Sequence, residues 1–117
     1  MNRVVAFEMS SQEPEKAAKF YSAVFDWKIG EPNYGYHHAN TGNQEESGID
    51  GGIAKGPHDH PLGTRVQIEV ESIDQTVEKA KANGAMVVRE KMDFGDFCLA
   101  YLVDPTGLGF SLIENKK

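Results

Sequence analysis

Cysteine, basic residues and long apolar runs are all scarce in this chain of 117 residues. The single cysteine, Cys98, excludes an internal disulfide framework, and its place in an apolar run predicts an inert core residue. That run, Cys98–Val103, is the longest in the chain and is too short to cross a bilayer. The 12 basic residues stand against 18 acidic ones, a formal net charge of −6, which argues against nucleic acid or an anionic membrane as the main partner.

The length of the chain fits one ordinary domain with enough residues to bury a core. The N-terminal residues enter a strand pattern directly, and we expect a cytoplasmic protein. The charge balance leaves a small organic molecule as the favoured partner, with no nucleic acid and no membrane.

One pattern of elements occurs twice along the chain: a strand, an amphipathic helix and three further strands. The first module covers about residues 3–55, the second about 64–115, and a linker rich in Gly and Pro covers about 56–63. This repetition predicts an α+β fold in a single domain, 1–117. Its two βαβββ modules would form a curved, cup-like mixed β-sheet with helices packed outside, and such a cup would hold a small molecule.

Both expected helices have recognisable ends. The first begins near Pro14 and ends near Phe25, and its apolar residues share one face that we expect to pack on the sheet: Ala17, Phe20, Tyr21, Val24 and Phe25. The second starts with a capping box of Ser72 and Gln75 and ends at Asn83-Gly84.

Alternation along the strands predicts which side chains face the cup. Glu8 lies opposite the apolar set of the first strand. Arg65, Gln67 and Glu69 lie opposite the apolar set of the matching strand in the second module, and Ser111 lies opposite Phe110 and Leu112 in the last strand. The floor of the cup is therefore expected to be polar and mixed in sign.

Two groups of histidines could be interpreted as metal ligands. His58-Asp59-His60 lies on a flexible connector, where three potential ligands rarely reach the geometry that tight binding needs, so we favour a solvated loop. His37 and His38 are adjacent in a strand and point to opposite faces, so at most one of them could face the cup.

Several segments together carry a family resemblance over almost the whole chain. They are Glu13 to Ile29 with its Phe-Tyr pair and Val-Phe-Asp-Trp turn, Ile68 to Asp74 with Asn83-Gly84-Ala85, and Asp104-Pro105-Thr106-Gly107 before the final strand. In order and spacing these segments resemble the vicinal oxygen chelate superfamily of glyoxalase, bleomycin-resistance and extradiol dioxygenase relatives. Ala6-Phe7-Glu8-Met9 is most similar to the first strand of its small glyoxalase-related group.

The resemblance implies a divalent metal in the cup, held by His, Gln or Glu and chelating two neighbouring substrate oxygens. The positions that match the family's ligands carry Ala6, Arg65 and Ser111, and a fourth lies near residues 49–53, where Asp50 is the nearby carboxylate. Alanine has no donor atom, arginine stays cationic and a neutral serine hydroxyl is a feeble ligand. We therefore expect no metal and no cofactor.

The first hypothesis is a metal-free binding protein or a metal-independent enzyme that holds a small organic molecule in the cup, as bleomycin-resistance relatives hold their antibiotic. Arg65 would hold a carboxylate, phosphate or enolate oxygen by a charge-assisted hydrogen bond. The candidate ligand-binding residues are Glu8, Arg65, Gln67, Glu69, Tyr101 and Ser111, and no catalytic residue is assigned. A structural ion pair between Arg65 and Glu8 is the alternative interpretation.

The second hypothesis is a metal-dependent lyase, isomerase or dioxygenase with displaced ligands drawn from Glu8, Glu69, His37 or His38, and Asp50. A third is an interaction module without a small ligand, for which the sequence offers no positive feature. Because a curled sheet exposes strand edges, and members of the superfamily pair two subunits to complete it, we expect a homodimer.

Overall fold

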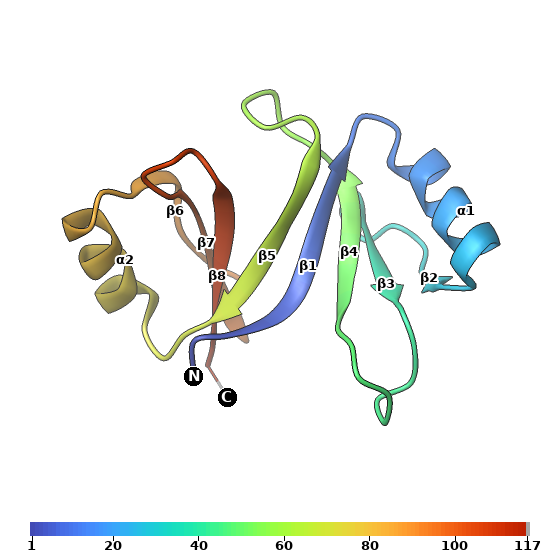
Figure 1. The fold of residues 1–117 in the computed structure, drawn as a ribbon, viewed down its shortest axis with the longest axis horizontal. Helices are drawn as coiled ribbons and strands as arrows, with labels where there is room; N and C mark the ends of the chain where they lie inside the picture. The colour runs from blue at the N-terminus through green and yellow to red at the C-terminus, as the bar shows by residue number, and fades with distance from the viewer. Residues whose placement is uncertain (117) are drawn as a thin grey trace. The chain divides into compact units, whose positions relative to one another are not determined.

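The computed structural model describes residues 1–116 of the chain, which divide into two compact units (Figure 1). One unit is Ala6–Thr64, and the other is Met1–Val5 with the described chain from Arg65 onward. Each unit carries one strand, one helix and then three strands, so the predicted α+β class and its two βαβββ modules are confirmed. The division falls between Val5 and Ala6, within the first strand.

The unit Ala6–Thr64 contains a mixed sheet covered on one face by helix α1 (Pro14–Phe25) (Figure 1). Its strands are β1 (Arg3–Ser11), β2 (Lys28–Ile29), β3 (Tyr36–Asn40) and β4 (Asp50–Lys55), in the order β2-β3-β4-β1. β4 runs parallel to β1 and antiparallel to β3. Helix α1 begins and ends at the residues that the sequence predicts, Pro14 and Phe25.

The apolar face of α1 is less buried than its periodicity predicts. Ala18 is the buried residue of this helix, whereas the side chains of Phe20, Val24 and Phe25 are 55%, 54% and 56% exposed. The expectation that these three pack on the sheet is wrong. The aromatic rings of the helix instead cluster with Trp27, whose ring stacks on that of Tyr21 at a centroid distance of 5.0 Å.

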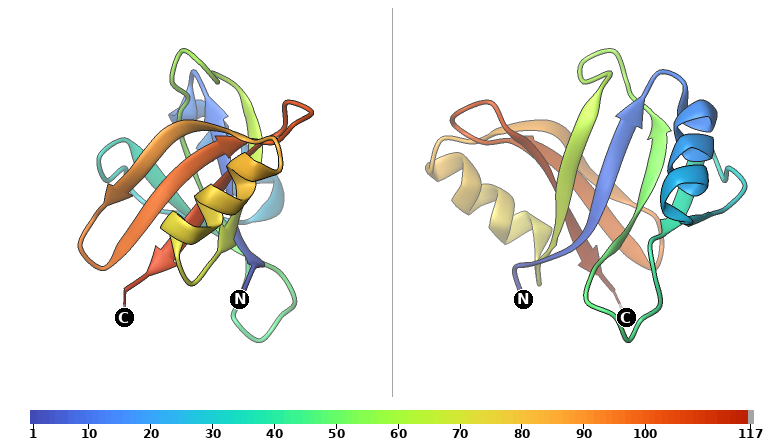
Figure 2. Two further views of the ribbon diagram at one scale, coloured as in Figure 1. Left: turned by 90° about the vertical axis from the view of Figure 1, so that its left-hand side faces the viewer. Right: turned by 45° about the vertical axis from the view of Figure 1, so that its right-hand side comes forward.

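The second unit packs helix α2 (Ile73–Ala82) against one face of a four-stranded sheet, as the left view of Figure 2 shows. Its strands are β5 (Gly63–Glu69), β6 (Met86–Asp93), β7 (Phe97–Val103) and β8 (Gly109–Asn115), in the order β5-β8-β7-β6. A core of buried residues joins helix and sheet: Val70, Ile73, Cys98, Ala100, Leu102 and Leu112. Cys98 is 2% exposed, as its apolar neighbours predict.

The ends of α2 follow the sequence signals. The Ser72 hydroxyl oxygen accepts a hydrogen bond from the backbone N–H of Gln75 at 3.1 Å, and Gly84 leaves the helix at a φ of +102°, where a side chain would be strained. Neither helix within residues 1–116 is long and apolar enough to span a membrane.

The segment before β8 is a turn closed by Asp104. Its carboxylate accepts hydrogen bonds from the backbone N–H groups of Thr106 at 2.8 Å and Leu108 at 3.0 Å, and from the Thr106 hydroxyl at 2.8 Å. These bonds, that of the Thr106 hydroxyl first, hold the pKa of Asp104 below its ordinary value. The motif Asp104-Pro105-Thr106-Gly107 therefore has a structural role here, because it sets the start of β8.

Candidate functional site

Three predicted site residues lie on one face of β5. Arg65, Gln67 and Glu69 alternate with Val66 and Ile68, and Ile68 packs against the core under α2. Strand geometry therefore turns Arg65, Gln67 and Glu69 to the opposite face of the sheet from α2. Gln67 is 9% exposed, and the other two are half-buried.

The neighbouring strands bring Ser111 and Tyr101 to the same face. Gln67 of β5 lies beside Ser111 of β8, and Ser111 lies beside Tyr101 of β7, so the three form a row across the sheet. Ser111 is fully buried, and its hydroxyl oxygen has no hydrogen-bond partner within residues 1–116. A buried hydroxyl without a partner costs about 1–3 kcal/mol, which makes Ser111 the energetically costly member of the row.

The side chain of Arg65 lies over β8 and reaches Tyr101. Its guanidinium carbon is 5.3 Å from the centroid of the Tyr101 ring, within the range of a cation–π interaction. On the way it passes Gly109, where an added β-carbon would lie 3.8 Å from the Arg65 Nε atom. The ring thus holds the guanidinium in a defined place above the row formed by Gln67, Ser111 and Tyr101.

A second guanidinium joins this face through a β-bulge that the sequence pattern does not reveal. In β6, Val87 lies beside Leu102 on the core side, yet Arg89 lies beside Tyr101, because the register shifts between them. Regular alternation would have placed Arg89 on the same face as Val87, so it was not among the predicted site residues. We call Arg65, Gln67, Arg89, Tyr101 and Ser111 the Arg65 face.

Glu69, the acidic residue on the same face of β5, is hydrogen-bonded to an amide. The carboxylate of Glu69 accepts a hydrogen bond from the side-chain amide of Asn115 at 2.8 Å. Two guanidinium groups, an amide and two hydroxyls therefore share this face of the sheet with the carboxylate of Glu69, in a chain whose formal net charge is −6. Such a set of donors is suited to oxygen atoms that carry negative charge.

Glu8 lies in the unit Ala6–Thr64, where a glycine on the neighbouring strand leaves room for an aromatic ring beside it. It pairs with Gly52 of β4, and the outer end of the Tyr36 ring fills the space that a side chain at Gly52 would take. Burial, and secondarily the charge of Glu8, raises the pKa of the Tyr36 phenol above its ordinary value. Glu8 and Tyr36 are thus neighbours on the face of this sheet opposite α1.

The alternative metal ligands do not assemble around Glu8. His37 lies beside Ile53 and is bonded to the carbonyl of Gly30 on the α1 side, whereas His38 lies beside Gly52 on the face of Glu8. Asp50 accepts a hydrogen bond from the backbone N–H of Thr41 at 2.9 Å and closes the turn between β3 and β4.

The residues present do not fit the divalent cation of the superfamily. The matching positions hold the methyl group of Ala6, the guanidinium of Arg65 and the hydroxyl of Ser111. In the part of the chain that the structure describes, no three His, Cys, Asp or Glu side chains lie close enough together to hold a metal ion, and this includes the connector with His58 and His60. An arginine at a ligand position repels a cation and favours an anion.

Comparison with known proteins places the chain in a family. A family model of the glyoxalase-like domain matches residues 5–113, whereas none of the curated proteins compared with the chain matches it. The fold is similar to that of a variant of methylmalonyl-CoA epimerase from Streptomyces coelicolor in complex with 2-nitronate-propionyl-CoA, at 12% identity and a TM-score of 0.68. This match covers 100% of this chain and 99% of the epimerase.

Two further structures share the fold at low identity. Hypothetical protein BH1468 from Bacillus halodurans C-125 is 17% identical with a TM-score of 0.68, covering 99% of this chain and 96% of that one. A protein from Staphylococcus aureus is 14% identical with a TM-score of 0.66, covering 99% of both chains. The motifs of the sequence, the match over residues 5–113 and the shared fold agree: the chain belongs to the glyoxalase-like domain family of the vicinal oxygen chelate superfamily.

Proposed function

We propose that this protein binds a small organic anion on the Arg65 face, without the divalent metal of its superfamily. The single observation that carries the proposal is the guanidinium of Arg65 held 5.3 Å above the Tyr101 ring, beside the buried and unpartnered hydroxyl of Ser111. A carboxylate, phosphate or enolate oxygen would accept hydrogen bonds from the guanidinium, and from the Ser111 hydroxyl once the Arg65 and Tyr101 side chains move aside to admit it. Arg65 thus supplies the positive charge that a metal supplies in other members.

The rest of the ligand would contact an apolar surface. Ile113 lies beside Glu69, and Leu99 lies beside Ile113, on the face that carries Arg65, and both apolar residues are half-buried. Val103 lies beside Gly109 on the same face. We therefore favour an anion attached to an aromatic or branched aliphatic group, because an apolar group gains free energy by leaving water on such a surface.

Ligand-observed NMR with matched probes tests this proposal. Benzoate and phenylphosphonate carry an anionic group on an apolar ring, whereas benzamide has the same ring without the charge. We expect saturation transfer from the protein to benzoate and phenylphosphonate and little transfer to benzamide. Equal transfer to benzamide would contradict an anion site, since it would show that the ring alone accounts for binding.

Variants of Arg65 separate binding from folding. Loss of a charge-assisted hydrogen bond of about 1.5–3 kcal/mol corresponds to a loss of roughly tenfold or more in affinity for phenylphosphonate in Arg65→Ala. Arg65→Lys should bind with intermediate affinity, because it keeps the charge and loses the fork of donors. If Arg65→Ala lowers the free energy of unfolding by as much as it weakens the free energy of binding, Arg65 is a structural residue and the proposal fails.

The proposal includes a homodimer. Phe20, Val24 and Phe25 on α1 are each more than half exposed, and pairing with a second copy would remove this apolar surface from water. Sedimentation equilibrium at micromolar concentration should give twice the chain mass of 12.9 kDa. A single species of 12.9 kDa would contradict the pairing.

A further inference from the structure

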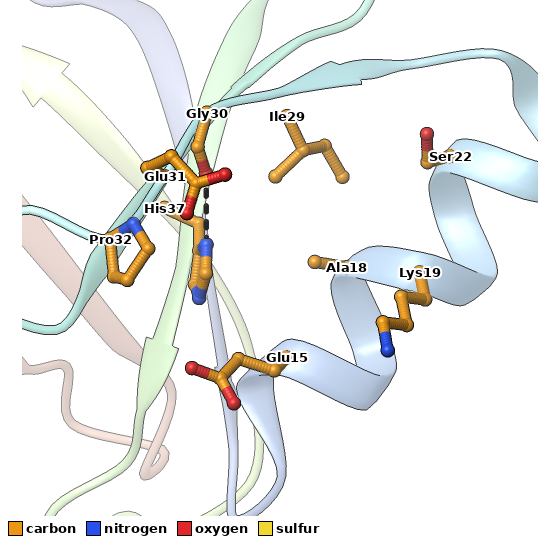
Figure 3. A pocket seen from close by; sticks show the side chains of 9 residues that line it. All are labelled: Glu15, Ala18, Lys19, Ser22, Ile29, Gly30, Glu31, Pro32 and His37. Atoms are coloured by element: carbon orange, nitrogen blue, oxygen red, sulfur yellow. Dashed lines mark hydrogen bonds between the residues drawn. The ribbon is translucent and has the colours of Figure 1, made fainter.

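A pocket lies within the unit Ala6–Thr64, on the face of its sheet that α1 covers (Figure 3). Its volume is about 340 Å³, which is enough for a small metabolite. Side chains of α1 form one wall, and His37 of β3 with the residues that follow β2 forms the other. His37 and Glu8 lie on opposite faces of this sheet, because His37 pairs with Ile53 and Glu8 pairs with Gly52. All residues that line the pocket belong to this unit, and none of them is a member of the Arg65 face.

The buried imidazole of His37 provides one acceptor. The side chain is 6% exposed, and its Nδ1 atom lies 3.0 Å from the backbone carbonyl oxygen of Gly30. A carbonyl can only accept, so in the neutral ring Nδ1 carries the proton and Nε2 keeps a lone pair. Nε2 has no hydrogen-bond partner within residues 1–116, although His37 lines the pocket.

Two carboxylates and one ammonium group complete the polar lining. Glu15 and Lys19 lie one turn apart on α1, and Glu31 follows β2. In Figure 3 the carboxylates of Glu15 and Glu31 lie at the His37 end of the pocket, and Ser22 lies at the other end. None of the three charged groups forms an ion pair within the described chain, and together they leave one negative charge. The side chains of Ala18 and Ile29 line the pocket as apolar surface.

We propose that this pocket binds the primary ammonium group of a small aliphatic amine. An ammonium has only N–H donors, so it can donate to the Nε2 atom of His37, and its charge is attracted by the carboxylates of Glu15 and Glu31 without all three acceptors having to converge on one point. The aliphatic stem would lie against Ala18 and Ile29. A metal ion is a poorer match, because no three His, Cys, Asp or Glu side chains of residues 1–116 lie close enough together to coordinate one.

NMR of the full chain with three probes of one size tests the site. n-Butylammonium, n-butanol and n-butyrate share the stem and differ in the head group. We expect n-butylammonium to shift the His37 imidazole nitrogen resonances and the backbone amides of the pocket along a saturable curve. n-Butanol and n-butyrate should shift them weakly and without saturation. Shifts of equal size with n-butyrate, or shifts that stay linear with n-butylammonium, would overturn the proposal.

Charge-neutral variants locate the ammonium. Glu15→Gln and Glu31→Gln should each weaken n-butylammonium binding by roughly two- to fivefold, because each removes a charged acceptor that is exposed to solvent. Both residues are exposed, so both variants should fold. Glu78→Gln, a change on α2 with the same loss of charge, should leave binding unchanged. Equal weakening by Glu78→Gln would show that overall charge, and not this pocket, attracts the amine.

Discussion

The guanidinium of Arg65 and the ring of Tyr101 meet across a strand, with 5.3 Å between the guanidinium carbon and the ring centroid. Arg65 belongs to β5 and Tyr101 to β7, and β8 lies between these two strands. Because β8 offers Gly109 and Ser111 on this face, only small side chains lie under the contact. The arrangement holds a cation in place and leaves a buried hydroxyl beside it, which is the basis for the proposed anion site.

Ser111 should affect stability and binding in opposite directions. Ser111→Ala removes a buried hydroxyl that has no partner in residues 1–116, so the free energy of unfolding should stay the same or rise by up to about 1 kcal/mol. The same change should weaken phenylphosphonate binding, because the ligand loses a hydrogen-bond donor. Urea unfolding and calorimetric titration measure the two quantities. Ser47→Ala in an exposed turn is the control, and a large loss of stability in Ser111→Ala would show that the hydroxyl has a structural partner.

Tyr36 should give the protein a stability that is lost at alkaline pH. Burial, and then the charge of Glu8, raises the pKa of its phenol above 10.0 in the folded state. The folded protein therefore binds this proton more tightly than the unfolded chain. The contribution to stability is complete below about pH 10 and is lost as pH rises through the folded-state pKa.

Absorbance of phenolate during an alkaline titration checks this expectation. Tyr36→Phe should remove a late-titrating phenol, and the free energy of unfolding of this variant should fall less between about pH 9 and pH 11 than that of the unchanged protein. Glu8→Gln should lower the pKa of Tyr36. Tyr34→Phe, a change at a fully exposed ring, is the control. An unchanged late titration in Tyr36→Phe would contradict the assignment.

Replacing each of two adjacent glycines of β4 with alanine should lower the free energy of unfolding by unequal amounts. A β-carbon at Gly51 would meet the backbone carbonyl oxygen and ring of Phe7, and one at Gly52 would meet the outer end of the Tyr36 ring. Backbone moves less easily than the end of a side chain. We expect Gly51→Ala to lower the free energy of unfolding by about 2–3 kcal/mol and Gly52→Ala by about 1 kcal/mol. Urea unfolding decides the order, and a larger loss in Gly52→Ala would contradict the packing described here.

The repeated pattern of the sequence was sufficient to predict the two βαβββ modules, because turn residues, caps and alternation all act locally. The cap of α2 and the faces of β5 and β8 agree with the structure for the same reason. Arg89 could not be predicted, since one extra residue in β6 reverses which side chains face α2.

The apolar face of α1 shows that the spacing of apolar residues predicts a helix but does not predict how deeply its side chains are buried. The spacing of Phe20, Val24 and Phe25 indicates a helix correctly, yet all three stay more than half exposed. Their burial depends on the breadth of the sheet beneath the helix, and β2 has only two residues. Tyr36 illustrates the same dependence on distant residues, because its position follows from the absence of a side chain at Gly52.

Calorimetric titration of phenylphosphonate into untagged protein, freed of metal by chelation and dialysis, tests the central proposal most directly. The same titration is repeated after one equivalent of nickel, zinc, manganese or iron(II) is added back. We predict the same dissociation constant with and without metal, and a loss of roughly tenfold or more in Arg65→Ala under both conditions. Binding that appears only after metal is restored would contradict the proposal, and would favour a metal-dependent lyase, isomerase or dioxygenase with displaced ligands.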